Sequence, residues 1–189
     1  HRKVLEISSD LLKNYLNSTA LYLIRIKTNY KLEEFNSVIE QCNKGIKINP
    51  NIAEMYFLKA NALSKIGDFE KALENLEEAT KKKYPYLEAY LNIGHINHQL
   101  GKNTEAIKNF KEVIKIDPKN YKAHYNLGVV LFEQKNHKDA LNYFRKTLKY
   151  YPSYVNAYLQ VGNIYLEKGQ IIRAISYFKQ LLKLDKNSK

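Results

Sequence analysis

The chain of 189 residues has one cysteine, one methionine and no tryptophan. A single cysteine cannot form a disulfide within the chain, so the fold depends on a hydrophobic core rather than on a disulfide framework. No apolar run approaches the roughly 18 residues of a membrane span, and no signal peptide is recognisable at the N-terminus. These absences favour a reducing compartment, and we expect a cytoplasmic location. Because the chain begins with His1 and not with Met, we expect a fragment of a longer protein.

Motifs for catalysis are also missing. The sequence contains no glycine-rich phosphate loop, no nucleophile elbow and no H-E-x-x-H zinc motif. His95 and His98 are three residues apart on one expected helix, but no Cys, Asp or third His accompanies them as a metal ligand. We expect His124 to pack in the interior and Cys42 to be a buried thiol. The chain is therefore predicted to be non-catalytic, with no metal and no cofactor.

Arginine is scarce in a strongly basic chain. The formal net charge is +12, yet the 31 basic residues comprise 27 Lys and only four Arg. Phosphate and base recognition favours the planar guanidinium of Arg, whereas Lys is a hydrated point charge that is common on ordinary surfaces. Nucleic acid and membrane are therefore disfavoured as partners.

Glycine, alanine and phenylalanine recur along the chain with a period of 34 residues. Gly94, Gly128 and Gly162 are 34 residues apart, and small and aromatic residues repeat at the same interval. These are Ala72, Ala106, Ala140 and Ala174, with Phe110, Phe144 and Phe178. The period predicts one continuous domain of five units, 19–52, 53–86, 87–120, 121–154 and 155–188, after a lead of 18 residues.

Each unit is predicted to form two amphipathic helices, because apolar residues recur three and four positions apart in both halves. In the third unit, Gly101 ends the first helix and Pro118 ends the second. Residues 1–18 have the same spacing and indicate the second helix of a truncated preceding repeat. The last helix offers Ile172, Leu181 and Leu184 on its outside, so we expect further repeats or a capping helix beyond it.

These units resemble the tetratricopeptide repeat. The fourth unit matches its signature with His124, Leu127-Gly128, Ala140, Phe144 and Pro152. The resemblance implies an all-α fold of the α-α superhelix type, a right-handed solenoid of antiparallel helix hairpins whose first helices line a concave groove. Departures are Lys59-Ala60 in the second unit, Lys186 in the fifth, and a first unit that keeps little beyond Tyr22 and Pro50.

Carboxamide side chains recur at the places that the resemblance assigns to the groove. Asn92, Asn126 and Gln160 occupy one place, and Asn61 and Asn163 occupy another. A carboxamide can pair with both the N–H and the C=O of an extended peptide. The set is similar to the asparagine ladder of the O-GlcNAc transferase repeats. The alternative is that a chain with 20 Asn scatters them over every surface.

Aromatic residues in the groove are expected to anchor a partner, unless they close against a neighbouring helix of the array. A two-carboxylate clamp for an acidic tail is disfavoured, because two of its three cations are absent. The predicted partner-binding residues are Phe57, Asn61, Asn92, His95, Lys122, Tyr125, Asn126, Phe132, Gln160 and Asn163.

The predicted function is a protein–protein interaction scaffold that binds a peptide or a helix of a partner in the groove. Alternatives are the substrate-recognition arm of a larger enzyme, such as a glycosyltransferase, and binding of an anionic partner by the lysines. Eight of the twelve net charges lie beyond residue 120. We therefore expect an acidic partner to bind the back of units 121–154 and 155–188. Self-association through either end remains open.

Overall fold

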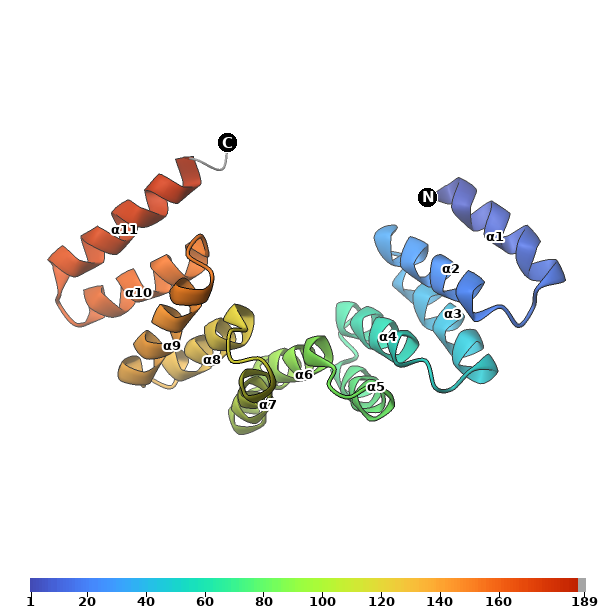
Figure 1. Cartoon of the computed structure of the whole chain (residues 1–189), viewed down its shortest axis with the longest axis horizontal. Helices are drawn as coiled ribbons and strands as arrows, with labels where there is room; N and C mark the ends of the chain where they lie inside the picture. The colour runs from blue at the N-terminus through green and yellow to red at the C-terminus, as the bar shows by residue number, and fades with distance from the viewer. Residues whose placement is uncertain (187–189) are drawn as a thin grey trace. The chain divides into compact units, whose positions relative to one another are not determined.

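The chain folds into successive α-helices joined by short turns (Figure 1). The computed structural model describes residues 1–186, and these contain eleven helices and no strand, which confirms the predicted all-α fold. Residues 187 and 188 of the last predicted unit lie outside the described residues. The helices are α1 (Arg2–Asn14), α2 (Thr19–Lys31), α3 (Phe35–Ile48), α4 (Ala53–Lys65), α5 (Phe69–Lys82), α6 (Leu87–Gln99), α7 (Asn103–Ile116), α8 (Tyr121–Glu133), α9 (His137–Tyr150), α10 (Val155–Glu167) and α11 (Ile171–Lys186).

The predicted helix of the lead is α1, and each predicted window after it contains two helices. We call α2, α4, α6, α8 and α10 the first helices and α3, α5, α7, α9 and α11 the second helices. No helix within residues 1–186 has the length and apolar character needed to cross a membrane.

The chain forms two compact units. Unit 1 comprises residues 1–96 and unit 2 begins at Asn97, so the division falls within α6. Unit 1 contains α1 to α5 with most of α6, and unit 2 contains α7 to α11.

Two apolar clusters form the core of unit 1. One joins α2, α3 and α4 through Tyr22, Ile26, Val38, Cys42, Met55 and Ala62. The other joins α4, α5 and α6, with Ala60, Leu76 and Ile93 among its members. Because α4 contributes to both clusters, successive hairpins of unit 1 share their cores, as expected of a repeat that cannot bury its apolar face alone.

The core of unit 2 is continuous across α9, α10 and α11. It includes Phe144, Val161, Ile164, Tyr165 and Ala174. The spacing on α9 explains the orientation of that helix: Ala140, Phe144 and Thr147 are three and four residues apart, share one face and are all fully buried.

A close approach inside the unit 2 hairpins depends on glycine. A Cβ atom built on Gly128 of α8 would lie 2.7 Å from the ring of Phe144 on α9, and Phe178 of α11 covers Gly162 of α10 in the same way. The ring of Phe144 therefore fills the space that a side chain at position 128 would need.

The turn between the two helices of each hairpin has one residue with positive φ. Gly67, Gly101 and Gly169 occupy this place with φ of 86°, 73° and 67°. Glu33 and Lys135 occupy the equivalent place in other hairpins with φ of 59° and 62°. Only glycine adopts this conformation without a steric penalty, so these two turns are strained.

Candidate functional site

The ten predicted partner-binding residues all lie on first helices, and we call the surface that they form within each unit the first-helix face of that unit. In unit 1, α4 carries Phe57 and Asn61, and α6 carries Asn92 and His95. In unit 2, α8 carries four of the residues and α10 carries two. These six are Lys122, Tyr125, Asn126, Phe132, Gln160 and Asn163.

The two carboxamides of unit 1 bind each other. Asn92 Nδ2 donates a hydrogen bond to Asn61 Oδ1 at 2.7 Å, which links α6 to α4. Both side chains are half-buried. The bond occupies one donor of Asn92 and the acceptor of Asn61, so this pair contributes to packing between hairpins as well as to the surface.

Phe57 of unit 1 also contacts a neighbouring residue of the chain. The centroid of its ring lies 5.0 Å from the centroid of the Tyr86 ring. Lys83 Nζ lies over the Tyr86 ring, 4.5 Å from its centroid. Burial, with the nearby carboxylates of Glu54 and Glu88, raises the pKa of Tyr86 to about 12. Phe57 is half-buried by this contact, whereas His95 is exposed.

Tyr125 is the centre of an aromatic group in unit 2. Its ring lies 5.6 Å from Phe144 and 4.9 Å from Tyr154, so the side chain is half-buried. Burial raises the pKa of Tyr125, and a side-chain hydrogen bond with Gln160 acts in the opposite direction. That bond links α8 to α10, and Gln160 lies at the register that Asn92 occupies in unit 1.

Asn126 and Asn163 differ from the other carboxamides of the first-helix faces. Both are half-buried, and neither has a hydrogen-bond partner within the part of the chain that the structure describes. Lys122, one turn before Asn126, is exposed, and Phe132 is half-buried with its ring edge-on to His137 at 5.4 Å. Unit 2 therefore presents two carboxamides with free donors and acceptors beside partly exposed aromatic rings.

Ionisable residues of the first helices also contact one another across successive hairpins. Lys27 Nζ lies 2.8 Å from Glu54 Oε1 in unit 1, and His98 Nε2 lies 2.7 Å from Glu133 Oε2 in unit 2. We did not expect these pairs from the sequence, although the recurrence of charged residues at equivalent places could have indicated them. The Lys27–Glu54 pair reduces the free charge of the first helices of unit 1.

His124 and Cys42 are buried residues, and no metal cluster involves the histidines of the described chain. Within the described residues, no group of three or more His, Cys, Asp or Glu is placed to hold a metal ion. His124 is buried, with Nε2 at 2.9 Å from the carbonyl oxygen of Pro118, and burial lowers its pKa. Cys42 is fully buried, and burial raises the pKa of its thiol to about 12, which disfavours the reactive thiolate.

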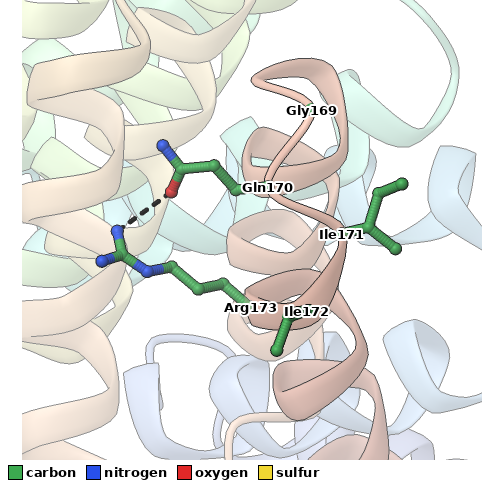
Figure 2. Close-up of a pocket in the computed structure, with 5 residues that line it drawn as sticks. All are labelled: Gly169, Gln170, Ile171, Ile172 and Arg173. Carbon is green, nitrogen blue, oxygen red and sulfur yellow. Dashed lines mark hydrogen bonds between the residues drawn. The ribbon is translucent and has the colours of Figure 1, made fainter.

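A pocket lies at the start of α11, and none of the ten predicted residues lines it (Figure 2). It is an open depression of about 560 Å³ lined by five consecutive residues, 169–173. Arg173 Nη1 donates to Gln170 Oε1 at 2.9 Å, and Figure 2 shows both side chains on one side of the turn with Ile171 on the other. An open pocket formed by one turn has no converging polar groups and does not suggest a ligand site.

Comparison with protein-family models identifies repeats in the chain. Tetratricopeptide repeat models match residues 42–74, 121–154 and 155–188, and a model described as TPR repeat matches residues 94–135. Together these segments cover more than half of the chain. The chain belongs to the tetratricopeptide repeat family. It is a protein–protein interaction scaffold.

Solved structures have the same fold. The crystal structure of MamA protein is 26% identical, with a TM-score of 0.77, and the match covers 89% of this chain and 92% of that one. YrrB, described as a TPR protein with an unusual peptide-binding site, is 14% identical with a TM-score of 0.73, over 94% of this chain and 91% of that one. PilF of Pseudomonas aeruginosa is 17% identical with a TM-score of 0.79, over 87% and 75% of the two chains. None of the curated proteins compared with the chain is a significant match.

Proposed function

We propose that the first-helix face of unit 2 binds an extended peptide segment of a protein partner. The observation that carries this proposal is the pair of carboxamides without partners, Asn126 and Asn163. Each offers one acceptor and two donors, which match the alternating N–H and C=O groups of an extended backbone. The peptide-binding site named for YrrB supports the same use of a TPR array.

The aromatic side chains give the proposed site its apolar contacts. Tyr125 and Phe132 are half-buried against Phe144, Tyr154 and His137, so they are held in place before a peptide arrives. A rigid aromatic ring loses little conformational entropy on binding. Lys122 adds one positive charge at the edge. A neutral or weakly acidic peptide with apolar side chains fits this combination.

The proposal extends to the organisation of the protein. We propose that the five predicted windows are the repeat units and that the chain has no catalytic role of its own. The matching family models and the structural neighbours are repeats, which supports this view. A cytoplasmic location is proposed because the only thiol, that of Cys42, is free and buried.

The test uses a peptide selected on the chain itself. A random dodecapeptide library is panned against the immobilised protein, and the best binder is synthesised with a fluorescent label. We expect the double variant Asn126→Ala/Asn163→Ala to weaken binding about tenfold, because two hydrogen bonds are lost at about 0.5–1.5 kcal/mol each. Fluorescence anisotropy gives the affinity.

The matched control is Asn43→Ala/Asn142→Ala, which removes two exposed carboxamides from second helices. This control should bind the peptide as the original chain does, and both variants should keep the original helix content and melting temperature. If the control weakens binding as much as the test variant, or if the test variant loses helix content, the first-helix face of unit 2 is not the binding site.

A further inference from the structure

The second helices of unit 2 expose basic residues at equivalent places. On α9, the positions opposite the buried Ala140, Phe144 and Thr147 are all exposed. The 34-residue period places the equivalent positions on α7 and α11. These exposed positions are Thr104, Lys108, Lys111 and Lys115 on α7, Lys138, Asn142, Arg145 and Lys149 on α9, and Ile172, Ser176, Lys179 and Lys183 on α11.

Some of these cations have an explanation within the fold. Lys115 and Lys149 lie in the last turn of their helices, where a positive charge interacts favourably with the helix dipole. Unit 1 has lysine at the same register, Lys47 and Lys81. Excluding this last-turn position leaves five cations, which we call the basic stripe: Lys108, Lys111, Lys138, Arg145 and Lys179.

The basic stripe has few contacts within the chain. None of its four lysines forms an ion pair among the described residues, and Arg145 donates from Nη2 to the hydroxyl oxygen of Tyr165. Lys108, Lys111 and Lys115 follow one another on α7 at spacings of three and four, where like charges are mildly destabilising. Folding does not explain this arrangement.

The same register in unit 1 has the opposite charge. Residues of α5 equivalent to Thr104, Lys108 and Lys111 are Glu70, Glu74 and Glu77. Exposed lysines of the unit 1 second helices also pair with carboxylates, as Lys44 does with Glu40 and Lys81 with Glu78. The fold therefore tolerates either sign at these places, and the charge of unit 2 is free to serve a partner.

We propose that the basic stripe of unit 2 binds an acidic segment of a protein partner. The positive charge of the stripe favours an anionic partner. The choice between lysine and arginine indicates which kind of anion it binds. The two arginines of unit 2 already have hydrogen-bond partners, Arg145 with Tyr165 and Arg173 with Gln170, while the other cations of the stripe are lysines. Lysine ammonium groups suit single carboxylates, whereas phosphate and base recognition favours free guanidinium groups. This proposal does not depend on the first-helix face.

The experiment measures binding of a fluorescent peptide of twelve glutamates to the whole chain. The test variant is Lys108→Glu/Lys111→Glu/Lys138→Glu, which reverses three exposed charges. The matched control is Lys3→Glu/Lys31→Glu/Lys47→Glu, which makes the same change in net charge at exposed lysines of unit 1. We expect the test variant to bind at least tenfold more weakly and the control to lose less than threefold. Circular dichroism checks that both variants fold.

Three outcomes would overturn the proposal. Equal weakening in both variants would mean that net charge alone attracts the peptide. Tighter binding of a twelve-nucleotide oligothymidine than of the peptide, lost in the test variant, would make the stripe a nucleic-acid site. The third outcome is a dimer, seen by sedimentation at low salt, that the variant Glu70→Lys/Glu74→Lys/Glu77→Lys abolishes. In that case the stripe would bind a second copy of the chain.

Discussion

At one register position of the second helices, unit 1 has Cys42 and Leu76 and unit 2 has Phe144 and Phe178 opposite the first helix of the same hairpin. The residue at the facing position on the first helices changes in size in the opposite direction. That position is occupied by Ile26 and Ala60 in unit 1, and by Gly128 and Gly162 in unit 2. A large residue on one helix faces a small one on the other, so each hairpin conserves the summed volume and not the individual residue.

The outer surfaces differ in charge while the hairpin geometry stays the same. Unit 1 has 14 Lys and Arg against 12 Asp and Glu, and unit 2 has 17 against seven, so their net charges are +2 and +10. Outward positions make no core contacts, so they tolerate either sign at little cost. The comparison shows that packing constrains one face of each helix and leaves the other available for partners.

The largest expected effect tests the role of the large member of a pair. Phe144→Ala should lower the free energy of unfolding by about 3–5 kcal/mol, because it empties a fully buried aromatic site. Cys42→Ala at the equivalent position should cost about 1 kcal/mol, since it removes a single buried group. Urea unfolding followed by circular dichroism measures both. Similar losses for the two variants would contradict the account of the pairs.

The second effect tests the exchange of volume between the two helices. Gly128→Ala should cost about 1–3 kcal/mol, because its Cβ would lie 2.7 Å from the Phe144 ring. The double variant Gly128→Ala/Phe144→Leu introduces the Ala60–Leu76 pair of unit 1 into unit 2. It should be less destabilised than the sum of the two single variants. Additive losses would show that the two positions do not share one volume.

The sequence predicted the helices because the period and the apolar spacing are strong signals. It also indicated that Gly101 ends the first helix of its unit. It did not indicate Glu33 and Lys135, since neither residue type favours positive φ, and only the register in the structure shows that they occupy the same turn.

The third effect concerns these turns. Gly101→Ala should cost about 1–2 kcal/mol, because an alanine at φ of 73° suffers a steric clash with its own backbone. Lys135→Gly should instead raise the melting temperature slightly, since it removes the same penalty from a turn with φ of 62°. Thermal unfolding compares the two variants. A loss of stability in Lys135→Gly would show that this turn is not strained.

The smallest expected effect is a pH dependence in unit 2. Burial lowers the pKa of His124 below its ordinary 6.5, so the unfolded chain binds a proton more readily than the folded chain. The neutral imidazole therefore favours folding above pH 6.5, and stability is lost as the pH falls through the folded pKa. In His124→Phe, the melting temperature should fall less between pH 8 and pH 5 than it does in the original chain. Equal falls would rule out His124 as the cause.

Much less of the candidate site could be predicted. The position of a residue in its helix determines the helix face on which its side chain lies. It does not determine which side chains of the next hairpin contact it. Asn61 and Asn126 occupy comparable surfaces, yet Asn61 accepts a hydrogen bond from Asn92 while Asn126 has no partner among the described residues. Likewise, the contact between Phe57 and Tyr86 depends on the approach of the next helix.

The central claim is that the carboxamides of unit 2 bind a peptide backbone. Nuclear magnetic resonance of the side-chain NH₂ groups tests it directly, with the selected dodecapeptide added to the labelled chain. The account predicts that the resonances of Asn126 and Asn163 shift in proportion to the bound fraction, while that of the exposed Asn142 on α9 stays in place. Shifts at Asn142 with none at Asn126 and Asn163 would contradict it.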